Sequence, residues 1–306
     1  MKVKLYVPDM ECESCSKVLG KRFAKLGGII STDFSDDAVD VSYDEAKVSA
    51  PQIIQTIKDA GYRASEQPFE RKNLRERTRE FIEKKAKYEL EHKLIPYSFL
   101  LFIVLTAIQL IAYAAYFKSI PGILETYGIW FIYLNISIAT LGIALWHYLS
   151  YKAKTTCMLG MMIGMTMGMQ TGMMLGAIIG ATNGLFLGAV IGVILAVSVG
   201  IITGKCCGIM GIMQGMMAGL MGGIMGPMTT LMLYSDHLLW FMPLYMLVNI
   251  LILGGFSYMI YEEMVENKEI TKQPIGITKL LLYATIVMII LSLCIIYGVR
   301  SPLFGG

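Results

Sequence analysis

Two cysteines near the start of the chain have a spacing that suits a soft metal ion. Cys12 and Cys15 lie in the segment Met-Glu-Cys-Glu-Ser-Cys that begins at Met10. Alternating apolar residues before this segment predict a strand, and helical spacing after it predicts a helix. The pair therefore falls at a loop-to-helix junction, where the positive helix end favours thiolates. Paired thiolates bind Cu(I), Hg(II) or Zn(II), and a redox-active thiol pair is the alternative.

The other four cysteines do not have the pattern of a structural disulfide framework. Cys206 and Cys207 are adjacent, while Cys157 and Cys294 stand alone in apolar segments. Adjacent thiols favour metal binding or thiol exchange over structural cross-links. We therefore predict that Cys157, Cys206 and Cys207 are further metal ligands, and that Cys294 is a packing residue.

Methionine is concentrated in one part of the chain. Of its 23 methionines, 16 lie between Met158 and Met232. Two sets in this stretch share one internal spacing, the second set lying 52 residues after the first. The first set is Met158, Met161, Met165, Met169 and Met173, and the second is Met210, Met213, Met217, Met221 and Met225. Residues four apart on a helix lie one above the other, so each set predicts a ladder of sulfur atoms.

These two ladders would suit the passage of a soft ion through a membrane. Thioether sulfur is a neutral ligand that binds Cu(I) or Ag(I), and it binds Zn(II), Mg(II) or Ca(II) poorly. Conduction requires several sites, none of them too tight. Facing ladders would meet this requirement, and the ten methionines therefore predict an ion pathway. The alternative is that flexible methionines fill gaps beside glycine.

The composition divides the chain into a charged part and an apolar part. Only 16% of all residues are charged, against about 25% in average soluble domains. Charged residues gather in residues 1–94, and the remainder contains seven apolar stretches. Each is long enough to cross a bilayer, which takes about 20 residues. The predicted spans are 95–117, 128–149, 157–180, 184–203, 206–230, 238–261 and 278–298.

Basic residues between the predicted spans indicate how the chain is oriented. If the N-terminus lies in the cytosol, seven spans put most of these residues on the cytosolic side, as the positive-inside rule requires. They are Lys93, Lys152, Lys154, Lys205, Lys268, Lys272 and Lys279. We therefore predict a multi-pass protein of the cell membrane with a cytosolic N-terminus.

The charged part predicts a ferredoxin-like α+β unit with the order βαββαβ. Its strands are expected at 2–8, 29–34, 39–43 and 62–64, and its helices at 13–26 and 50–60. With Met10-x-Cys12-x-x-Cys15, and with Gly61 and Tyr62 before the last strand, residues 2–65 resemble the heavy-metal-associated (HMA) domain of copper chaperones and metal ATPases.

The resemblance implies a role for each of these residues. Cys12 and Cys15 would be the metal ligands, Met10 would pack under the loop, and Tyr62 would lie near the site. Glu11 departs from the family pattern, which often has Thr at this position. An acidic residue here is seen in family members that take zinc-like ions, because a carboxylate adds a harder ligand.

The predicted domains are an HMA-like domain at 1–65, a charged helical connector at 66–94, and an all-α polytopic membrane bundle at 95–300. The bundle has a Gly- and Met-rich core at 157–232, where glycine recurs at every fourth residue. Such stripes let membrane helices approach closely. We expect the helices of this core to form a tight inner bundle.

These features predict a copper(I), or more generally soft-metal, transporter whose cytosolic HMA domain exchanges the ion with membrane Cys and Met residues. A mercury or zinc-type transporter, a membrane thiol oxidoreductase and a metal-binding assembly factor are the alternatives. No phosphorylation or nucleotide-binding motif is found, so no enzyme activity is expected. The expected ligand is copper(I), with Ag(I), Hg(II) or Zn(II) as alternatives and no organic cofactor. Expected partners are membrane lipid, a cytosolic metal chaperone and a second copy of the chain, but no nucleic acid.

Overall fold

The computed structural model describes residues 1–8, 10, 13–35, 38–68, 89–117, 123–151, 157–262 and 276–299. The chain divides into two compact units, which are described separately below. The first is the N-terminal α+β unit, and the second is a bundle of long apolar helices.

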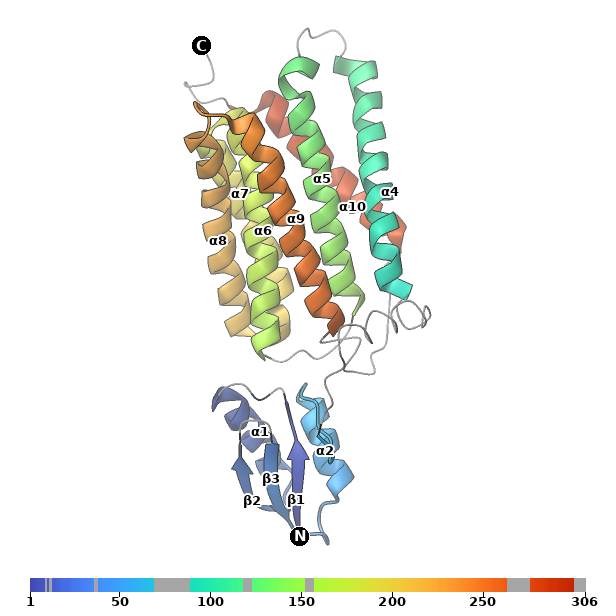
Figure 1. Cartoon of the computed structure of the whole chain (residues 1–306), viewed down its shortest axis with the longest axis vertical. Coiled ribbons are helices and arrows are strands. Elements are labelled where there is room, and N and C mark those ends of the chain that lie inside the picture. Colours follow the sequence, from blue (N-terminus) through green and yellow to red (C-terminus); the bar gives the residue numbers. More distant parts are fainter. Residues whose placement is uncertain are drawn as a thin grey trace. The chain divides into compact units, whose positions relative to one another are not determined.

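The N-terminal unit is a three-stranded antiparallel sheet with two helices (Figure 1). Its elements are β1 (Lys2–Tyr6), α1 (Glu13–Lys25), β2 (Ile29–Phe34), β3 (Ala38–Tyr43) and α2 (Ala50–Asp59). The strand order is β1-β3-β2, with Leu5 paired to Val39. The predicted last strand is reduced to one bridge, in which the backbone N–H groups of Tyr6 and Ser65 donate to each other's carbonyls at 2.8 and 3.2 Å. The ferredoxin-like fold class is confirmed.

Alternation in the strands and helical periodicity in α1 and α2 build one core in this unit. Leu5, Val39, Leu19 and Ile53 are fully buried together and come from four different elements. Helix α2 begins where the backbone N–H of Ser49 donates to the side-chain oxygen of Gln52 at 3.0 Å, one half of a capping box. This core holds the end of β1 and the start of α1 in place, so the intervening loop is anchored at both ends.

The bundle consists of seven helices that are long and apolar enough to cross a membrane. They are α4 (Glu89–Ala112), α5 (Ile123–Ser150), α6 (Cys157–Asn183), α7 (Leu185–Gly204), α8 (Ile209–Met232), α9 (Leu238–Ile260) and α10 (Ile277–Tyr297). Helix α4 continues as a π-helical turn, η1 (Tyr113–Phe117), and a 3₁₀ turn, η2 (Lys205–Cys207), joins α7 to α8. The seven predicted spans agree with these helices. Helix α4 begins inside the predicted connector 66–94, of which 69–88 lie outside the described residues.

Helices α6, α7 and α8 lie side by side and meet through their glycines (Figure 1). A Cβ built on Gly168 would lie 2.7 Å from the carbonyl oxygen of Gly215, and one on Gly172 would lie 2.8 Å from the Cα of Gly223. A Cβ on Gly164 would lie 3.0 Å from the Cα of Gly204. The stripes therefore bring backbone against backbone, as expected for small residues in membrane helices.

This contact predicts a sharp difference between glycines of the same protein. Replacing Gly172 by Ala would force α6 and α8 apart, and overpacking of this kind costs about 1–3 kcal/mol. Gly255 in α9 is the matched control, because nothing lies within 4 Å of a Cβ built there. We expect Gly172→Ala to lower the melting temperature in detergent clearly and Gly255→Ala to leave it unchanged or raise it. Equal melting temperatures for the two variants would contradict the close packing.

Candidate metal centres

The first candidate centre is the loop between β1 and α1. Cys15 is the third residue of α1, where the partial positive charge of a helix N-terminus favours an anionic sulfur. Its sulfur is not in a disulfide, and the residue is buried at the edge of the core. Met10 precedes it, with its backbone N–H donating to the Val7 carbonyl at 3.3 Å. Cys12 and Glu11 lie outside the described residues, so the predicted ligand pair is described at one member only.

Met10 and Tyr62 are buried in the same core as Cys15. Tyr62 follows Gly61, whose φ of +96° allows the chain to turn back toward the sheet after α2. The backbone N–H of Tyr62 donates to the Ile57 carbonyl at 3.2 Å. The structure therefore holds both residues in one packed unit with the described thiol.

The second candidate centre is the turn between α7 and α8. Cys206 donates its S–H to the Thr203 carbonyl at 3.4 Å, and the Tyr148 hydroxyl donates to the same carbonyl at 3.0 Å. A Cβ built on Gly160 would lie 2.7 Å from the Cβ of Cys207 and 2.9 Å from the Sγ of Cys206. Gly160 lies one turn beyond Cys157, the first residue of α6. The fold thus gathers the adjacent cysteines against the start of α6, where the third predicted cysteine begins the helix.

The cysteines of this turn differ in chemical state. Cys206 is an exposed free thiol, whereas Cys207 is in a disulfide. A sulfur in a disulfide is not a thiolate ligand, so in this state Cys206 is the available ligand of the pair.

The methionine ladders do not face each other across a closed route within one chain. The α8 ladder lies on the outer surface of the bundle, with Met213 56% and Met217 61% exposed. Met210, Met221 and Met225 are exposed as well. Each of the last four members stands two residues from a glycine of the stripe, and two residues turn a helix by about 200°. The glycine contacts with α6 and α7 therefore turn this ladder outward.

The α6 ladder lies beside the glycine stripe instead of opposite it. Its last four members each follow a stripe glycine by one residue, a rotation of about 100°. Met158 and Met165 are exposed, while Met161, Met169 and Met173 are partly buried. The side-chain N–H of Gln214 in α8 donates to the sulfur of Met165 at 3.4 Å. This exposed contact places Met165 of the α6 ladder at the edge of the α6–α8 interface.

A different group of methionines is buried inside the bundle. Met167 and Met174 in α6 and Met242 in α9 are fully buried, and Met246 in α9 and Met288 in α10 are nearly so. The ladder pattern did not indicate them. The signal that could have found them is their register, because Met167 and Met174 are seven residues apart and so share one face of α6.

Two buried amide side chains of α6 differ in their hydrogen bonding. Asn183 donates to the carbonyls of Cys294, Ile295 and Gly298 at 3.3–3.4 Å, and so ties the end of α6 to the end of α10. Gln170 is buried, and its side-chain oxygen has no hydrogen-bond partner among the described residues. Cys294 is a partly buried free thiol in α10.

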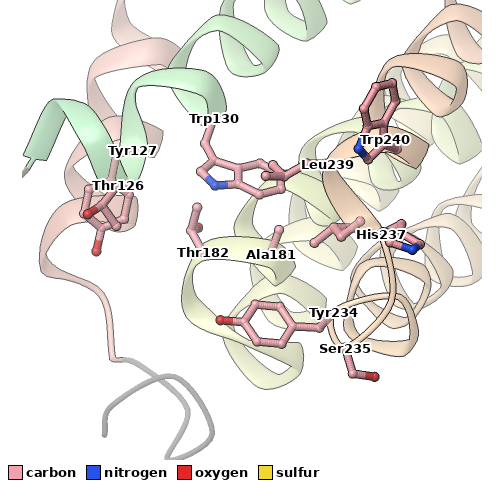
Figure 2. Close-up of a pocket in the computed structure, with 11 residues that line it drawn as sticks. Thr126, Tyr127, Trp130, Ala181, Thr182, Tyr234, Ser235, His237, Leu239 and Trp240 are labelled. Atoms are coloured by element: carbon pink, nitrogen blue, oxygen red, sulfur yellow. The ribbon is translucent and has the colours of Figure 1, made fainter.

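An aromatic pocket of about 580 Å³ lies where α6 ends and α9 begins. Figure 2 shows Thr182 and Ala181 between the rings of Trp130 and Tyr234, with Trp240 standing apart from them. The neighbouring Asp236 and His237 are exposed, and the Nε2 atom of His237 lies 3.9 Å from the Oδ1 atom of Asp236. In the part of the chain that the structure describes, no group of three or more His, Cys, Asp or Glu could hold a metal ion. Aromatic residues of this kind are typical of a membrane–water interface.

Comparison with known proteins identifies the N-terminal unit. Residues 4–63 match the heavy-metal-associated domain family. The copper chaperone CopZ of Staphylococcus haemolyticus is 38% identical over 58 residues, which are 18% of this chain and 85% of that protein. The mercuric transport protein periplasmic component of Salmonella typhi is 38% identical over 66 residues, which are 21% of this chain and 71% of that protein.

An uncharacterized protein of Haemophilus influenzae is 31% identical over 65 residues, which are 21% of this chain and 96% of that protein. No solved structure matches the chain. None of these matches covers the bundle. For the N-terminal unit, the fold, the cysteine at the start of α1 and the relatives all indicate the same family. Through residues 4–63, the chain belongs to the family of proteins that contain a heavy-metal-associated domain.

Proposed function

We propose that this protein moves a soft metal cation, copper(I) in the first place, across the cell membrane. In this proposal the HMA domain exchanges the ion with sulfur ligands of the seven-helix bundle. The observation that carries it is the presence of sulfur ligands in both units, at the start of α1 and at the α7–α8 turn. Copper(I) accepts thiolate and thioether ligands, so it can pass between them by ligand exchange.

The relatives support a thiophilic cargo. One is described as a copper chaperone and several as mercuric transport proteins, and all are matched through a domain that carries a cysteine pair here at Cys12 and Cys15. Hg(II) is therefore the alternative cargo. Zinc is less favoured in the interior of the bundle, where the fully buried sulfur atoms of the described residues are thioethers.

The distribution of basic residues supports a cytosolic N-terminus by the positive-inside rule. With seven spans, the α7–α8 turn then lies on the same side of the membrane as the HMA domain. Cys206 and Cys207 would be the sulfur atoms at which the ion enters or leaves the bundle on that side. Lys205 in the same turn contributes one of the positive charges that favour this orientation.

The buried methionines support a route within one chain better than the predicted ladders do. A sulfur atom on the lipid-facing surface of α8 would release the ion into hydrocarbon, where a bare cation is very unfavourable. The α8 ladder can line a route only where a second copy covers it. The thioethers of Met167, Met174, Met242 and Met246 need no such cover.

One observation favours a second function, that of a membrane thiol oxidoreductase. Cys207 is in a disulfide and the adjacent Cys206 is a free thiol, which is an arrangement suited to thiol–disulfide exchange. Two electrons and two protons from the Cys12–Cys15 dithiol would reduce that disulfide and leave a new one between Cys12 and Cys15. Such an activity would not depend on any methionine.

Replacing both Cys12 and Cys15 by Ser in the full chain should remove one tightly bound Cu(I), because thiolates hold Cu(I) more firmly than thioethers do. The measurement is titration of the reduced protein against a Cu(I) chelator. Cys294→Ser is the matched control, since this thiol lies within α10, and it should keep the full stoichiometry. Unchanged binding in the double variant would rule out the HMA loop as the tight site.

Uptake of Cu(I) into proteoliposomes tests transport directly. We expect the wild-type protein to exceed protein-free vesicles by about tenfold or more, since weak serial sites allow conduction. A variant with Met213, Met217, Met221 and Met225 all changed to Leu should stay within about twofold of wild type if the route lies inside one chain. Uptake no faster than in empty vesicles would refute the proposed function. A large loss in the ladder variant alone would instead indicate a route covered by a second copy.

A further inference from the structure

Three amide oxygens are buried in the bundle without a donor among the described residues, those of Asn135 in α5, Gln170 in α6 and Asn249 in α9. Gln170 in α6 is 4% exposed and Asn249 in α9 is 3% exposed. Neither the Oε1 atom of Gln170 nor the Oδ1 atom of Asn249 has a hydrogen-bond partner among the described residues. The amide nitrogen of Asn249 does have one, because it donates to the Tyr245 carbonyl at 2.7 Å. Buried polar atoms are normally satisfied, and an unsatisfied pair inside a membrane bundle points to a missing ligand.

Gln170 is on the face of α6 that turns away from α7 and α8. It stands two residues from both Gly168 and Gly172, a rotation of about 200° from the glycine stripe. The glycine face packs on α8 and α7, and α6 also packs on α5 and α9. Met167 and Met174 lie three residues before and four residues after Gln170, so they share its face. Both are fully buried.

Asn249 lies on the buried face of α9, together with Met242 and Met246 at helical spacing. Helices α6 and α9 run in opposite directions, because the end of α6 and the start of α9 line the same pocket. The hydroxyl of Tyr245 donates to the Met173 carbonyl at 3.2 Å and fixes the level of one helix against the other.

These directions bring the two amides to a similar depth. Gln170 is three residues before Met173, or about 4.5 Å along α6, and Asn249 is four residues after Tyr245, or about 6 Å along α9. Because the helices are antiparallel, both displacements point the same way. On α6, Gln170 lies about 18 Å from Thr182 and about 15 Å from Gly160, which is near the middle of a bilayer.

Helix α5 also packs against α6 and α9. The hydroxyl of Ser137 donates to the sulfur of Met246 at 3.7 Å, so α5 contacts the methionine face of α9. The α5–α6–α9 seam therefore holds two donor-free amide oxygens and three buried thioethers. We define this seam by Ser137, Met167, Gln170, Met174, Met246 and Asn249.

We propose that the α5–α6–α9 seam binds one dehydrated monovalent soft cation, Cu(I) or Ag(I), at mid-membrane. All its ligands are neutral, so they suit a single positive charge and would leave a divalent ion uncompensated. Thioethers select a soft ion, and the amide oxygens supply partial negative charge without the expense of a buried carboxylate. The identity of the cargo rests on the proposed function, but occupancy of the seam can be tested without transport.

The test uses full-length protein in detergent, with Cys12→Ser and Cys15→Ser removing the tight HMA site. Ag(I) is the probe because it does not change oxidation state. Binding is measured by calorimetry and by the rise in melting temperature. Met246→Leu should weaken binding at the tightest remaining site by about tenfold or more, as loss of a metal ligand or its support does. Met288→Leu is the control, because Met288 is equally buried and its sulfur accepts from Ser292 at the same distance of 3.7 Å. It should stay within about twofold.

The variant Gln170→Leu distinguishes between a seam that binds the cation and a seam that is empty or holds only water. If the seam binds the cation, this variant loses Ag(I) affinity as Met246→Leu does. If it does not, removal of an unsatisfied amide raises the melting temperature and leaves Ag(I) binding unchanged, which overturns the proposal. Asn249→Ala gives a second reading should Met246→Leu fold poorly, and unchanged affinity there also overturns it.

Ag(I) uptake and Ag(I) binding together distinguish between the seam and transport. Wild-type proteoliposomes that take up Ag(I), together with seam variants that bind and transport it as well as wild type, would refute the seam alone. Wild-type vesicles that take up no ion, combined with a seam that binds Ag(I), would refute transport and leave a buried metal site.

Discussion

The contact of glycine with glycine between α6, α7 and α8 decides where every other side chain of these helices can lie. In lipid, the hydrophobic effect does not drive membrane helices to associate, so close packing of their backbones stabilises the contact instead. At Gly168 and Gly215, and at Gly172 and Gly223, the backbones are so close that a Cβ would overlap its neighbour. No ion can pass along such a contact. The three glycine faces are therefore structural, and any chemistry must take place on the remaining faces.

The same contact sorts the methionines into two classes. On α8 the ladder at Met213 and Met217 stands about 200° from the stripe and is turned to the outside. On α6, Met167 and Met174 share the face of Gln170, and they are fully buried. A flexible thioether serves equally as lipid-facing apolar surface or as a soft ligand. Burial and the unsatisfied amides beside it, more than methionine content, distinguish the second use.

Both compact units contain cysteine thiols, and the redox state decides how many of them are available. Cys15 is an unbridged thiol at a helix start, and Cys206 is another at the α7–α8 turn, beside the disulfide-bonded Cys207. Reduction of that disulfide would add a thiol to the turn, whereas oxidation removes one. The two proposed functions, metal exchange and thiol exchange, would therefore use the same sulfur atoms. Of the two, only metal exchange would also use the buried thioethers.

The sequence alone was enough for the ferredoxin-like unit and the seven apolar helices, because local periodicity and hydrophobic length determine these features. It also contained the two-residue offset between glycine and methionine on α8, from which the outward direction of that ladder follows once the glycine face is known to be the contact. The depth match of Gln170 with Asn249, the approach of Ser137 to Met246 and the bond between Gln214 and Met165 came only from the tertiary structure. Each joins residues of different helices, and their meeting depends on how α5, α8 and α9 pack on α6, which no local pattern in the chain specifies.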